Sequence, residues 1–401
     1  MIGYKAFAEL ALSSDSDERG RAAYLAALAY LNHKGPAAEH AALYAALVGF
    51  LDDSSVKVRA ALAYGLLHSP DAPRPVILSL LQDSGVIARA VLQYSPVLVD
   101  ADLFDIVARA DASALLAIAQ RSAISSRLAA ALIARADHAL ILRLIRRKDV
   151  AIPPAVLDSL AAGTEDDAQM RGALLARQDL PATARLLLVR QVTESLQACR
   201  LVKGSLTSDR LGKLLRDGAD AAVAAIGEAE AGPSREDFIE SLVENNQLTT
   251  RLLLHSVVTG RVMFFASCVA GLANTGSSKV FTLLESGNRA SLTALFARCG
   301  LSVAANGLMV RLVLLARTAD LADDVAARHY VINALTEELI TEHSGNIPEE
   351  LEEVFGYLNE QNIALARKAA RGVMAAFART TEAAMALPPA SMPEMAQLSA
   401  A

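Results

Sequence analysis

The residue types that most often carry out chemistry are few in this sequence. Its seven histidines include no H-E-x-x-H pair, and its three cysteines (Cys199, Cys268 and Cys299) form no C-x-x-C motif. A G-x-S-x-G nucleophile elbow is also absent from the sequence. The cysteines lie in apolar, helix-like surroundings, which should raise the pKa of a thiol rather than activate it. We therefore expect no metal site, no cofactor and no catalytic residue, and we interpret the protein as non-enzymatic.

One glycine-rich segment, residues 271–279, has the glycine spacing of a phosphate-binding loop. Ser277 occupies the position where such a loop needs a lysine to face the phosphates. No run typical of a buried strand precedes the segment. We interpret it as a turn between two helices.

A group of basic residues is the best candidate for binding. Between residues 121 and 148 there are seven basic residues and one acid, Asp137. Aligned in a stack of helices, the seven would form a basic stripe for an acidic protein segment, an anionic head group or nucleic acid. The alternative is a solvated face with salt bridges between helices. The seven residues are Arg121, Arg127, Arg135, Arg143, Arg146, Arg147 and Lys148.

Residues 337–360 have the opposite character, with eight Glu and no Lys or Arg. This segment is either a partner surface or a solvated helix, and it could face the basic stripe in a dimer.

The elements that would position these residues follow a repeated pattern. In residues 51–66, a turn with Asp53 precedes apolar residues at spacings of three and four, which is typical of an amphipathic helix. Arg59, in the first turns of that helix, can reach acceptors on a neighbouring unit. The pattern recurs thirty residues later, with Asp83 and Arg89, and a third copy begins near residue 15.

A second pattern places a basic residue at a helix end, before a polar turn. Residues 144–150 align with residues 174–180 at an offset of thirty, with Asp149 and Asp179 in the turns, and residues 119–124 form a looser copy. Recurring units of 20–50 residues indicate a solenoid, because one helix pair cannot bury its apolar face alone. These units resemble HEAT-like helical repeats.

Composition supports a helical fold. The 401 residues are 53% hydrophobic but only 4% aromatic, with no Trp and no alternating β-branched run. We predict an all-α protein, a HEAT-like α-solenoid of stacked helix pairs followed by a C-terminal helical region. The net charge of −6 argues against a general nucleic-acid-coating protein.

The most membrane-like window is residues 252–273, which has the length of a membrane span. It carries His255 and Arg261, and an arginine near the centre of a span is costly. We therefore expect two buried helices separated at Thr259-Gly260. Residues 1–12 lack the pattern of a signal peptide, so we expect a cytoplasmic protein.

The sequence suggests four regions. Residues 1–230 are expected to form HEAT-like repeats, and the Ala-Gly-Pro-Ser sequence at 231–234 marks the boundary. Residues 231–318 should form a compact helical unit that could continue the array. Residues 319–384 should form two longer amphipathic helices, and residues 385–401 a disordered tail.

Several short motifs resemble an uncharacterised bacterial family, domain of unknown function 2336. They cover roughly residues 100–310, and this sequence departs from the family where Arg261-Val262-Met263 replaces an acidic residue before the paired phenylalanines. The resemblance implies an all-helical, HEAT-like fold and transfers no catalytic residues. The motifs are Ala176–Pro181, Leu252–Leu254, Gly260, Phe264-Phe265, Gly271-Leu272 and Ala297–Leu301.

Three functions are compatible with these observations. The first is a protein-binding scaffold or adaptor, which could form a homodimer through its C-terminal helices. The second is a nucleic-acid-binding protein of the DNA-repair type, which the acidic balance makes the weaker hypothesis. The third is a sensor of a small ligand or lipid, with Phe264 and Phe265 lining a pocket.

Overall fold

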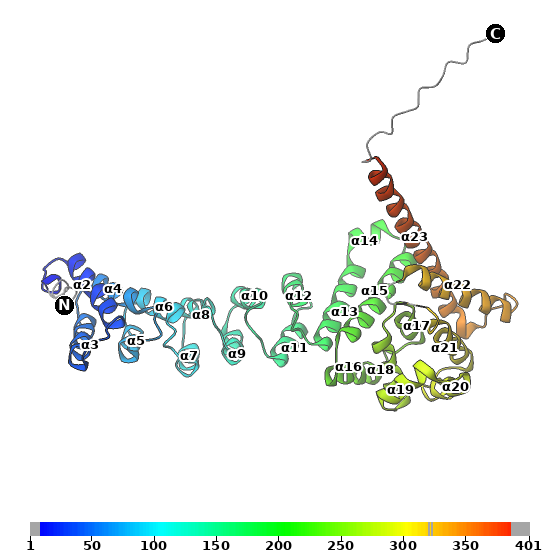
Figure 1. Ribbon diagram of the computed structural model, residues 1–401, viewed down its shortest axis with the longest axis horizontal. Helices are drawn as coiled ribbons and strands as arrows, with labels where there is room; N and C mark the ends of the chain where they lie inside the picture. Colours follow the sequence, from blue (N-terminus) through cyan, green and yellow to red (C-terminus); the bar gives the residue numbers. More distant parts are fainter. Residues whose placement is uncertain (1–8, 320, 322–323, 386–401) are drawn as a thin grey trace, which may run out of the picture. The chain divides into compact units, whose positions relative to one another are not determined.

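A computed structural model describes residues 9–319, 321 and 324–385 (Figure 1). In these residues every regular element is an α-helix, which confirms the all-α prediction. The chain forms two compact units, residues 1–188 and residues 189–401. The boundary predicted from the sequence lies later, at 230/231, where an alanine-rich segment meets the Ala-Gly-Pro-Ser sequence.

Unit 1, residues 1–188, consists of short helices. In unit 1 each even-numbered helix from α2 to α10 packs against the next even-numbered helix, and α3 packs on α5 and α7 on α9. Figure 1 shows these helices in two rows, with even numbers in one and odd numbers in the other. The helices are α2 (Ser16–Leu31), α3 (Ala37–Leu51), α4 (Val56–Leu66), α5 (Arg74–Leu80), α6 (Gly85–Tyr94), α7 (Asp100–Val107), α8 (Ala112–Ala119), α9 (Ser126–Arg135), α10 (His138–Arg146), α11 (Pro154–Ala162), α12 (Ala168–Leu175) and the first part of α13 (Ala182–Ala198).

The two-row packing follows from the local sequence. Along α4, Val58, Leu62 and Leu66 recur every four residues and are fully buried. Aspartates begin several helices: the Asp111 and Asp137 carboxylates accept hydrogen bonds from backbone N–H groups in the first turns of α8 and α10. These helices thus show the buried face and the defined starts that the predicted repeat requires. The solenoid interpretation itself stays a prediction.

Arginines connect successive even-numbered helices of unit 1. Arg121, just after α8, donates hydrogen bonds to the carbonyls of Leu92 (2.5 Å) and Ser95 (2.8 Å) at the end of α6. Arg147, just after α10, donates to the carbonyl of Ala119 at the end of α8 (2.7 Å). The carbonyls at a helix end have no partner within the helix, so an arginine from the next helix pair supplies one.

Arg177, just after α12, makes the fullest set of these contacts. Its guanidinium donates to the carbonyls of Ile145 (2.9 Å) and Arg147 (3.0 Å) at the end of α10, and to that of Val150 (2.8 Å) in the segment that follows. The same group is ion-paired with Asp179. This contact explains the second repeated sequence pattern. The basic residue of the pattern caps the preceding even-numbered helix, and the aspartate of the pattern orients that basic residue.

The first repeated pattern has a related basis. Arg59 is ion-paired with Asp83 (2.6 Å) and donates to the carbonyl of Asp53, while the Asp53 carboxylate is paired with Arg19 (2.8 Å). The hydrogen bond from Arg59 lowers the pKa of Asp83, and that from Arg19 lowers the pKa of Asp53. Arg89, which aligns with Arg59, is exposed and forms no ion pair within the described residues.

Unit 2, residues 189–401, contains longer helices around a central one. Every residue of α17 from Arg251 to Val258 is buried, and α17 contacts α15, α18, α21 and α23. The helices are the rest of α13, α14 (Arg200–Ser205), α15 (Ser208–Ala229), α16 (Pro233–Glu244), α17 (Thr250–Val258), α18 (Val262–Ala273), α19 (Ser277–Ser286), α20 (Arg289–Arg298), α21 (Val303–Ala316), α22 (Val325–Glu342) and α23 (Glu349–Met385).

The apolar window at 252–273 is therefore a pair of buried helices, α17 and α18, as predicted, with Gly260 in the turn at a φ of 75°. Among the described residues, none of the helices combines the length and hydropathy that a membrane crossing needs. The glycine-rich segment at 271–279 is the predicted turn, since α18 ends at Ala273 and α19 begins at Ser277. Of the predicted tail at 385–401, Met385 is the last residue of α23, and the rest lies outside the described residues.

A buried polar cluster joins α23 to this core. Arg251 is ion-paired with Asp217 and with Asp220 (2.8 Å), and its guanidinium lies 5.1 Å from the centre of the Tyr357 ring. The Tyr357 hydroxyl is 2.8 Å from Nδ1 of His255. Burial lowers the pKa of His255 to about 4, so the imidazole is neutral at pH 7. The first turns of α23 are therefore fixed to α15 and α17 by mutually satisfied polar groups.

Candidate functional site

The seven basic residues of the predicted stripe fall into two groups. Arg121 is only 9% exposed, and its guanidinium, like that of Arg147, is bound to main-chain carbonyls. Burial lowers the pKa of Arg121, in keeping with a guanidinium enclosed by protein. These two arginines therefore stabilise the fold, and only the remaining five can form a binding surface.

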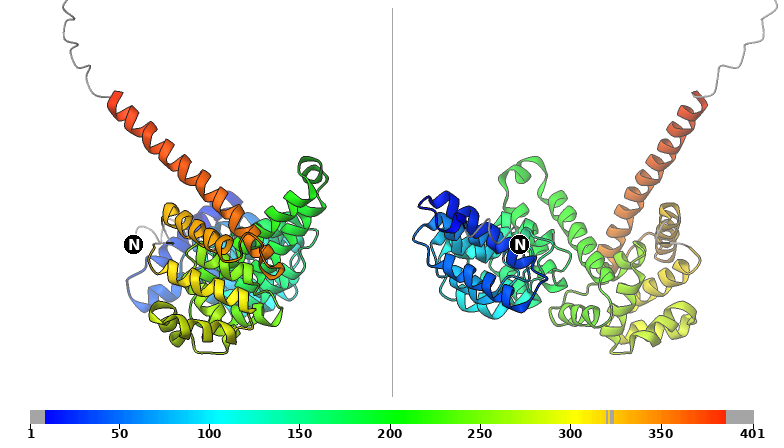
Figure 2. Two further views of the ribbon diagram at one scale, coloured as in Figure 1. Left: turned by 90° about the vertical axis from the view of Figure 1, so that its right-hand side faces the viewer. Right: turned by 60° about the vertical axis from the view of Figure 1, so that its left-hand side comes forward.

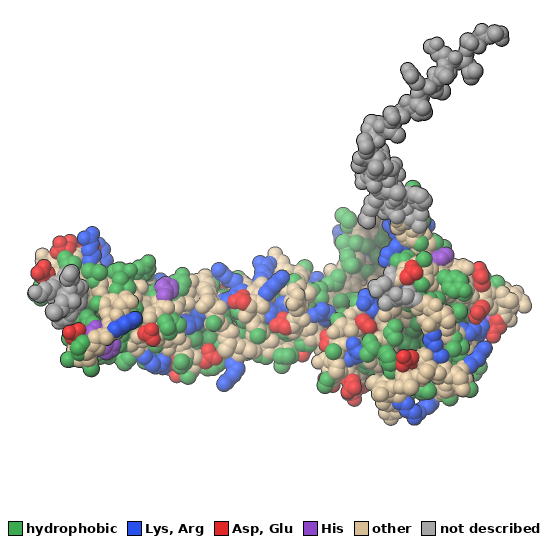
Figure 3. Space-filling model, viewed as in Figure 1, with side chains coloured by type: hydrophobic (Ala, Val, Ile, Leu, Met, Phe, Trp, Pro, Cys, Tyr) green, Lys and Arg blue, Asp and Glu red, His purple; other side chains and the backbone are tan. Residues whose placement is uncertain are grey.

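The remaining five basic residues are exposed. Arg127 lies 5.4 Å from the centre of the Phe104 ring, which is a cation–π contact. Within the described part of the chain, no ion pair or side-chain hydrogen bond involves Arg135, Arg143, Arg146 or Lys148. On the face that Figure 3 shows, the basic side chains of unit 1 are interspersed with acidic ones and do not form one continuous stripe.

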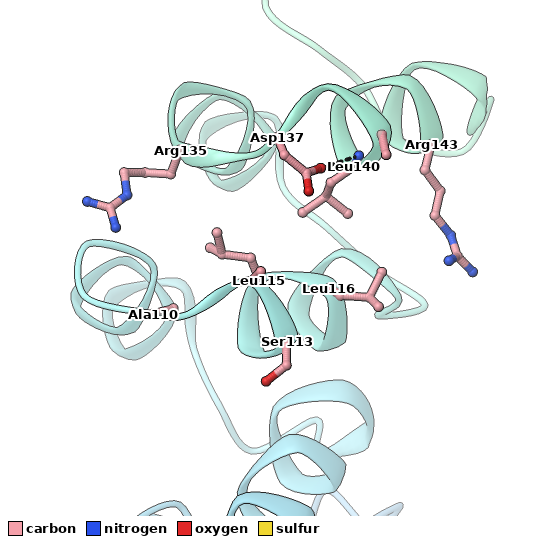
Figure 4. A pocket seen from close by; sticks show the side chains of 10 residues that line it. Ala110, Ser113, Leu115, Leu116, Arg135, Asp137, Leu140 and Arg143 are labelled. Atoms are coloured by element: carbon pink, nitrogen blue, oxygen red, sulfur yellow. Dashed lines mark hydrogen bonds between the residues drawn. The ribbon is translucent and has the colours of Figure 1, made fainter.

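A groove lies between α8 and α10, and two of the exposed arginines line it. We call this cavity of about 600 Å³ the α8–α10 groove. Arg135 comes from the end of α9 and Arg143 from α10, and Figure 4 shows them at opposite ends of the groove. The groove therefore has a positive charge at each end.

The floor of the groove is apolar. Leu115 of α8 and Leu140 of α10 are largely buried in it, whereas Leu116 is 37% exposed. The Asp137 carboxylate also lines the groove, where it accepts a hydrogen bond from the backbone N–H of Leu140 (2.8 Å), drawn in Figure 4. That bond begins α10 and holds the carboxylate at the helix N-terminus. The groove thus combines an apolar strip with two outward-facing cations.

Sequence reasoning identified Arg135 and Arg143 but missed the leucines of the groove. Leu115 and Leu116 belong to α8, a short and almost wholly apolar helix whose sequence predicts only a buried segment. The groove exists because α8 and α10 pack side by side, and the thirty-residue repeat is the signal that could have located it. The predicted structural aspartates, Asp149 and Asp179, lie in the turns after α10 and α12, beside their arginines and outside the groove.

A second cavity lies within unit 2. It has a volume of about 340 Å³ and is lined mainly by apolar side chains of α17, α18, α19 and α21. Phe265 and Phe281 are among them, with Val257 and Val313. Phe264, which we expected to line a pocket, instead packs against Gly227 and Phe238 in the core.

The cysteines show one departure from prediction. Burial raises the pKa of Cys268, and it raises that of Cys299 to about 11, as their apolar surroundings predict. Cys199 is exposed at the start of α14, and hydrogen bonds from the backbone N–H groups of Val202 and Leu201 lower its pKa. The expectation of an apolar environment is therefore wrong for Cys199.

Comparison with known proteins places the groove inside a family region. A family model described as an uncharacterised protein conserved in bacteria (DUF2336) matches residues 87–342. The chain belongs to this family. The match confirms the resemblance inferred from short motifs and extends it in both directions, from α6 to the end of α22. No curated protein and no solved structure matches the chain.

The region of this DUF2336 protein that the family model matches contains the whole α8–α10 groove and the apolar cavity of unit 2. It also contains the three arginines that cap helix ends, which we call the capping arginines: Arg121, Arg147 and Arg177. The repeated units before residue 87 lie outside the match. Helix α23 also lies outside it, since it begins at Glu349.

Proposed function

We propose that this DUF2336 protein is a non-enzymatic, cytoplasmic scaffold or adaptor whose unit 1 binds an acidic segment of another protein in the α8–α10 groove. The observation that carries the proposal is the contrast between two sets of arginines. Arg121, Arg147 and Arg177 are held by carbonyl groups, whereas Arg135 and Arg143 lie at the ends of an apolar groove without an acidic partner in the described residues.

The chemistry of the groove defines the partner. Two guanidinium groups at the ends favour carboxylates, which arginine binds with paired hydrogen bonds. The strip formed by Leu115, Leu116 and Leu140 favours an apolar side chain between those carboxylates. A fitting segment therefore has one or two apolar residues flanked on both sides by Asp or Glu.

The two kinds of contact contribute differently. Burying one leucine-sized side chain contributes about 1.5–3 kcal/mol, whereas an exposed ion pair contributes about 0–1 kcal/mol. The apolar contact should therefore supply most of the affinity. The arginines should set the orientation of the segment and accelerate its association.

The partner can be sought by affinity purification with mild cross-linking from the native host, read by mass spectrometry. An Arg135→Glu/Arg143→Glu variant should lose a discrete protein partner that the original chain retains. The matched control is Arg190→Glu/Lys279→Glu, which makes the same charge change at exposed residues outside the groove. Arg147 is left unchanged because it holds α8 and α10 together.

The binding mode can then be tested with a synthetic peptide from the cross-linked region of the partner. Binding should weaken at least tenfold in Arg135→Glu/Arg143→Glu and also in Leu116→Asp, and it should persist in the control variant. Equal partner recovery from the groove variant and the control would contradict the proposal. A salt-dependent gel shift with duplex DNA that is lost in the groove variant would favour the nucleic-acid alternative instead.

The apolar cavity of unit 2 favours a second candidate function, the sensing of a small apolar ligand. Its volume of about 340 Å³ lies in the range of small-ligand pockets, and its lining offers few polar groups. Native mass spectrometry of the protein purified from its host would show a bound ligand as added mass. A Val313→Trp variant, which fills the cavity, should lose that mass, and a bare chain mass in both proteins would count against this function.

A further inference from the structure

Helix α23 extends well beyond the part of it that packs on unit 2. Among the side chains of this helix that the structure describes, the last buried one is Leu365, whereas the helix continues to Met385. Figures 1 and 2 both show its last turns projecting from unit 2. Ile363 is 56% exposed on this helix, so apolar surface is left without a cover in the described residues.

Among the described side chains of α23, the exposed charges are separated by sign along the helix. Glu349, Glu350 and Glu353 lie in its first turns, and the basic residues Arg367, Lys368 and Arg371 lie farther along. All six side chains are exposed. In the described part of the chain, none of them is ion-paired.

The spacing places the two sets on one face. Each basic residue follows its acidic counterpart by 18 residues: Arg367 follows Glu349, and Arg371 follows Glu353. Eighteen residues make five complete turns of an α-helix, or about 27 Å. One face of α23 thus carries exposed acidic side chains at its start and exposed basic side chains about five turns later.

This face is complementary to itself in the antiparallel direction. We infer that two copies of the chain associate through their α23 helices, antiparallel, about a two-fold axis near residue 360. In that register Glu349 of one copy lies opposite Arg371 of the other, Glu353 opposite Arg367, and Glu350 beside Lys368. Two-fold symmetry repeats each pair, so six ion pairs form along the contact.

The centre of the contact is sterically suited to close approach. Gly356 lies on the same face, and nothing occupies the space within 4 Å of where its Cβ would be. In the antiparallel register Ile363 of each copy packs over Gly356 of the other, which covers the exposed apolar side chain. Glu360, at the midpoint, is already ion-paired with Lys213 of its own chain (2.7 Å), so the two Glu360 carboxylates do not meet unpaired.

Sedimentation velocity of the full chain tests the inference. The protein should be dimeric at micromolar concentration, and raising the salt should weaken the dimer about tenfold or more, because exposed ion pairs are screened. An Arg367→Glu/Arg371→Glu variant should be monomeric under the same conditions. Gly356→Leu should also weaken the dimer, whereas Gly372→Leu, at a second glycine of α23 with open space around its Cβ position, should not.

A compensating variant separates loss of pairing from loss of folding. Glu349→Arg/Glu353→Arg combined with Arg367→Glu/Arg371→Glu restores all complementary pairs in the antiparallel register and should dimerise again. A parallel contact predicts a different result, in which this variant pairs with the original chain and not with itself. That result would overturn the inference, as would an original chain that stays monomeric up to about 100 μM or a dimer that the double variant leaves intact.

This inference is independent of the proposed function. The Arg135→Glu/Arg143→Glu variant should lose the partner protein and keep the dimer, whereas Arg367→Glu/Arg371→Glu should lose the dimer and still bind the partner-derived peptide. Failure of either proposal is therefore visible without the other.

Discussion

Replacement of Arg177 by methionine should destabilise unit 1 more than any change of an exposed arginine. The Arg177 guanidinium is nearly enclosed and donates to three main-chain carbonyls, those of Ile145, Arg147 and Val150, at 2.8–3.0 Å. Methionine keeps most of the aliphatic stem, so the substitution leaves only a small cavity and little stability is lost for that reason. What the variant loses is the set of donors at the end of α10.

The magnitude follows from the acceptors left behind. A buried polar group without a partner costs about 1–3 kcal/mol, and the bonds to Ile145 and Val150 are both buried. The carbonyl of Arg147 is partly buried, so water can replace some of its hydrogen bond. The sum is about 3–5 kcal/mol, a large part of the total stability of a typical domain, about 5–15 kcal/mol.

Urea unfolding followed by circular dichroism measures this loss, since the chain has no Trp to serve as a fluorescent probe. Hydrogen exchange read by mass spectrometry should locate it, with faster exchange in α10 and α12 than in unit 2. Arg177→Lys should recover only part of the stability, because an ammonium cannot reproduce the planar fork of donors.

Arg135→Met is the control, because Arg135 is exposed and its loss should change stability by less than about 0.5 kcal/mol. The capping argument fails if Arg177→Met and Arg135→Met lower the free energy of unfolding by the same amount. It also fails if the amide hydrogens of α10 exchange at the original rate in the Arg177 variant. The assignment of the second repeated sequence pattern to helix capping would then fail with it.

Three further predictions rest on other features. Gly227→Ala should destabilise unit 2 by about 1–3 kcal/mol in urea unfolding, because the new Cβ would lie 2.1 Å from the Phe264 ring, whereas Gly172→Ala, with nothing within 4 Å, should be neutral or stabilising. The lowered pKa and exposure of Cys199 should make it the first thiol to react with iodoacetamide, as peptide mapping would show, with the rate rising as the pH approaches its pKa from below. The pKa of His255 is about 4 in the folded protein and about 6.5 in the unfolded chain, so the unfolded chain binds the proton first as the pH falls. The free energy of unfolding should therefore decrease by about 3 kcal/mol between pH 6.5 and pH 4. His255→Gln should flatten this pH dependence in thermal unfolding curves.

Much of the helical organisation could be predicted from sequence, because many of the helices carry local start signals or apolar spacing. The break at Thr259-Gly260, the turn before Ser277 and the start of α23 at Glu349 are all local features of this kind. The boundary between the two units is different. The alanine-rich segment 219–229 continues as α15, because alanine favours a helix and this helix packs on α17 and α18.

The candidate site could be predicted only in part. A run of basic residues shows that positive charge is present but does not show which guanidinium meets a carbonyl. The acceptors of Arg121 and Arg147 are main-chain atoms 26–29 residues earlier, and no side-chain pattern marks them. The apolar floor formed by Leu115 and Leu140 could not be predicted either, because it arises where two helices that are separate in the sequence lie side by side in the fold.

The capping arginines also set an order in time. The end of α10 is completed by Arg177, which follows Ile145 by 32 residues, and the end of α8 by Arg147, which follows Ala119 by 28. A ribosome adds about 30 residues in roughly 2–6 seconds. During synthesis, the arginine that caps each of these helix ends is therefore added several seconds after the helix itself. While residues 119–177 are being synthesised, the chain therefore carries an incomplete helix end, and we expect a chaperone or protease to recognise the nascent protein there.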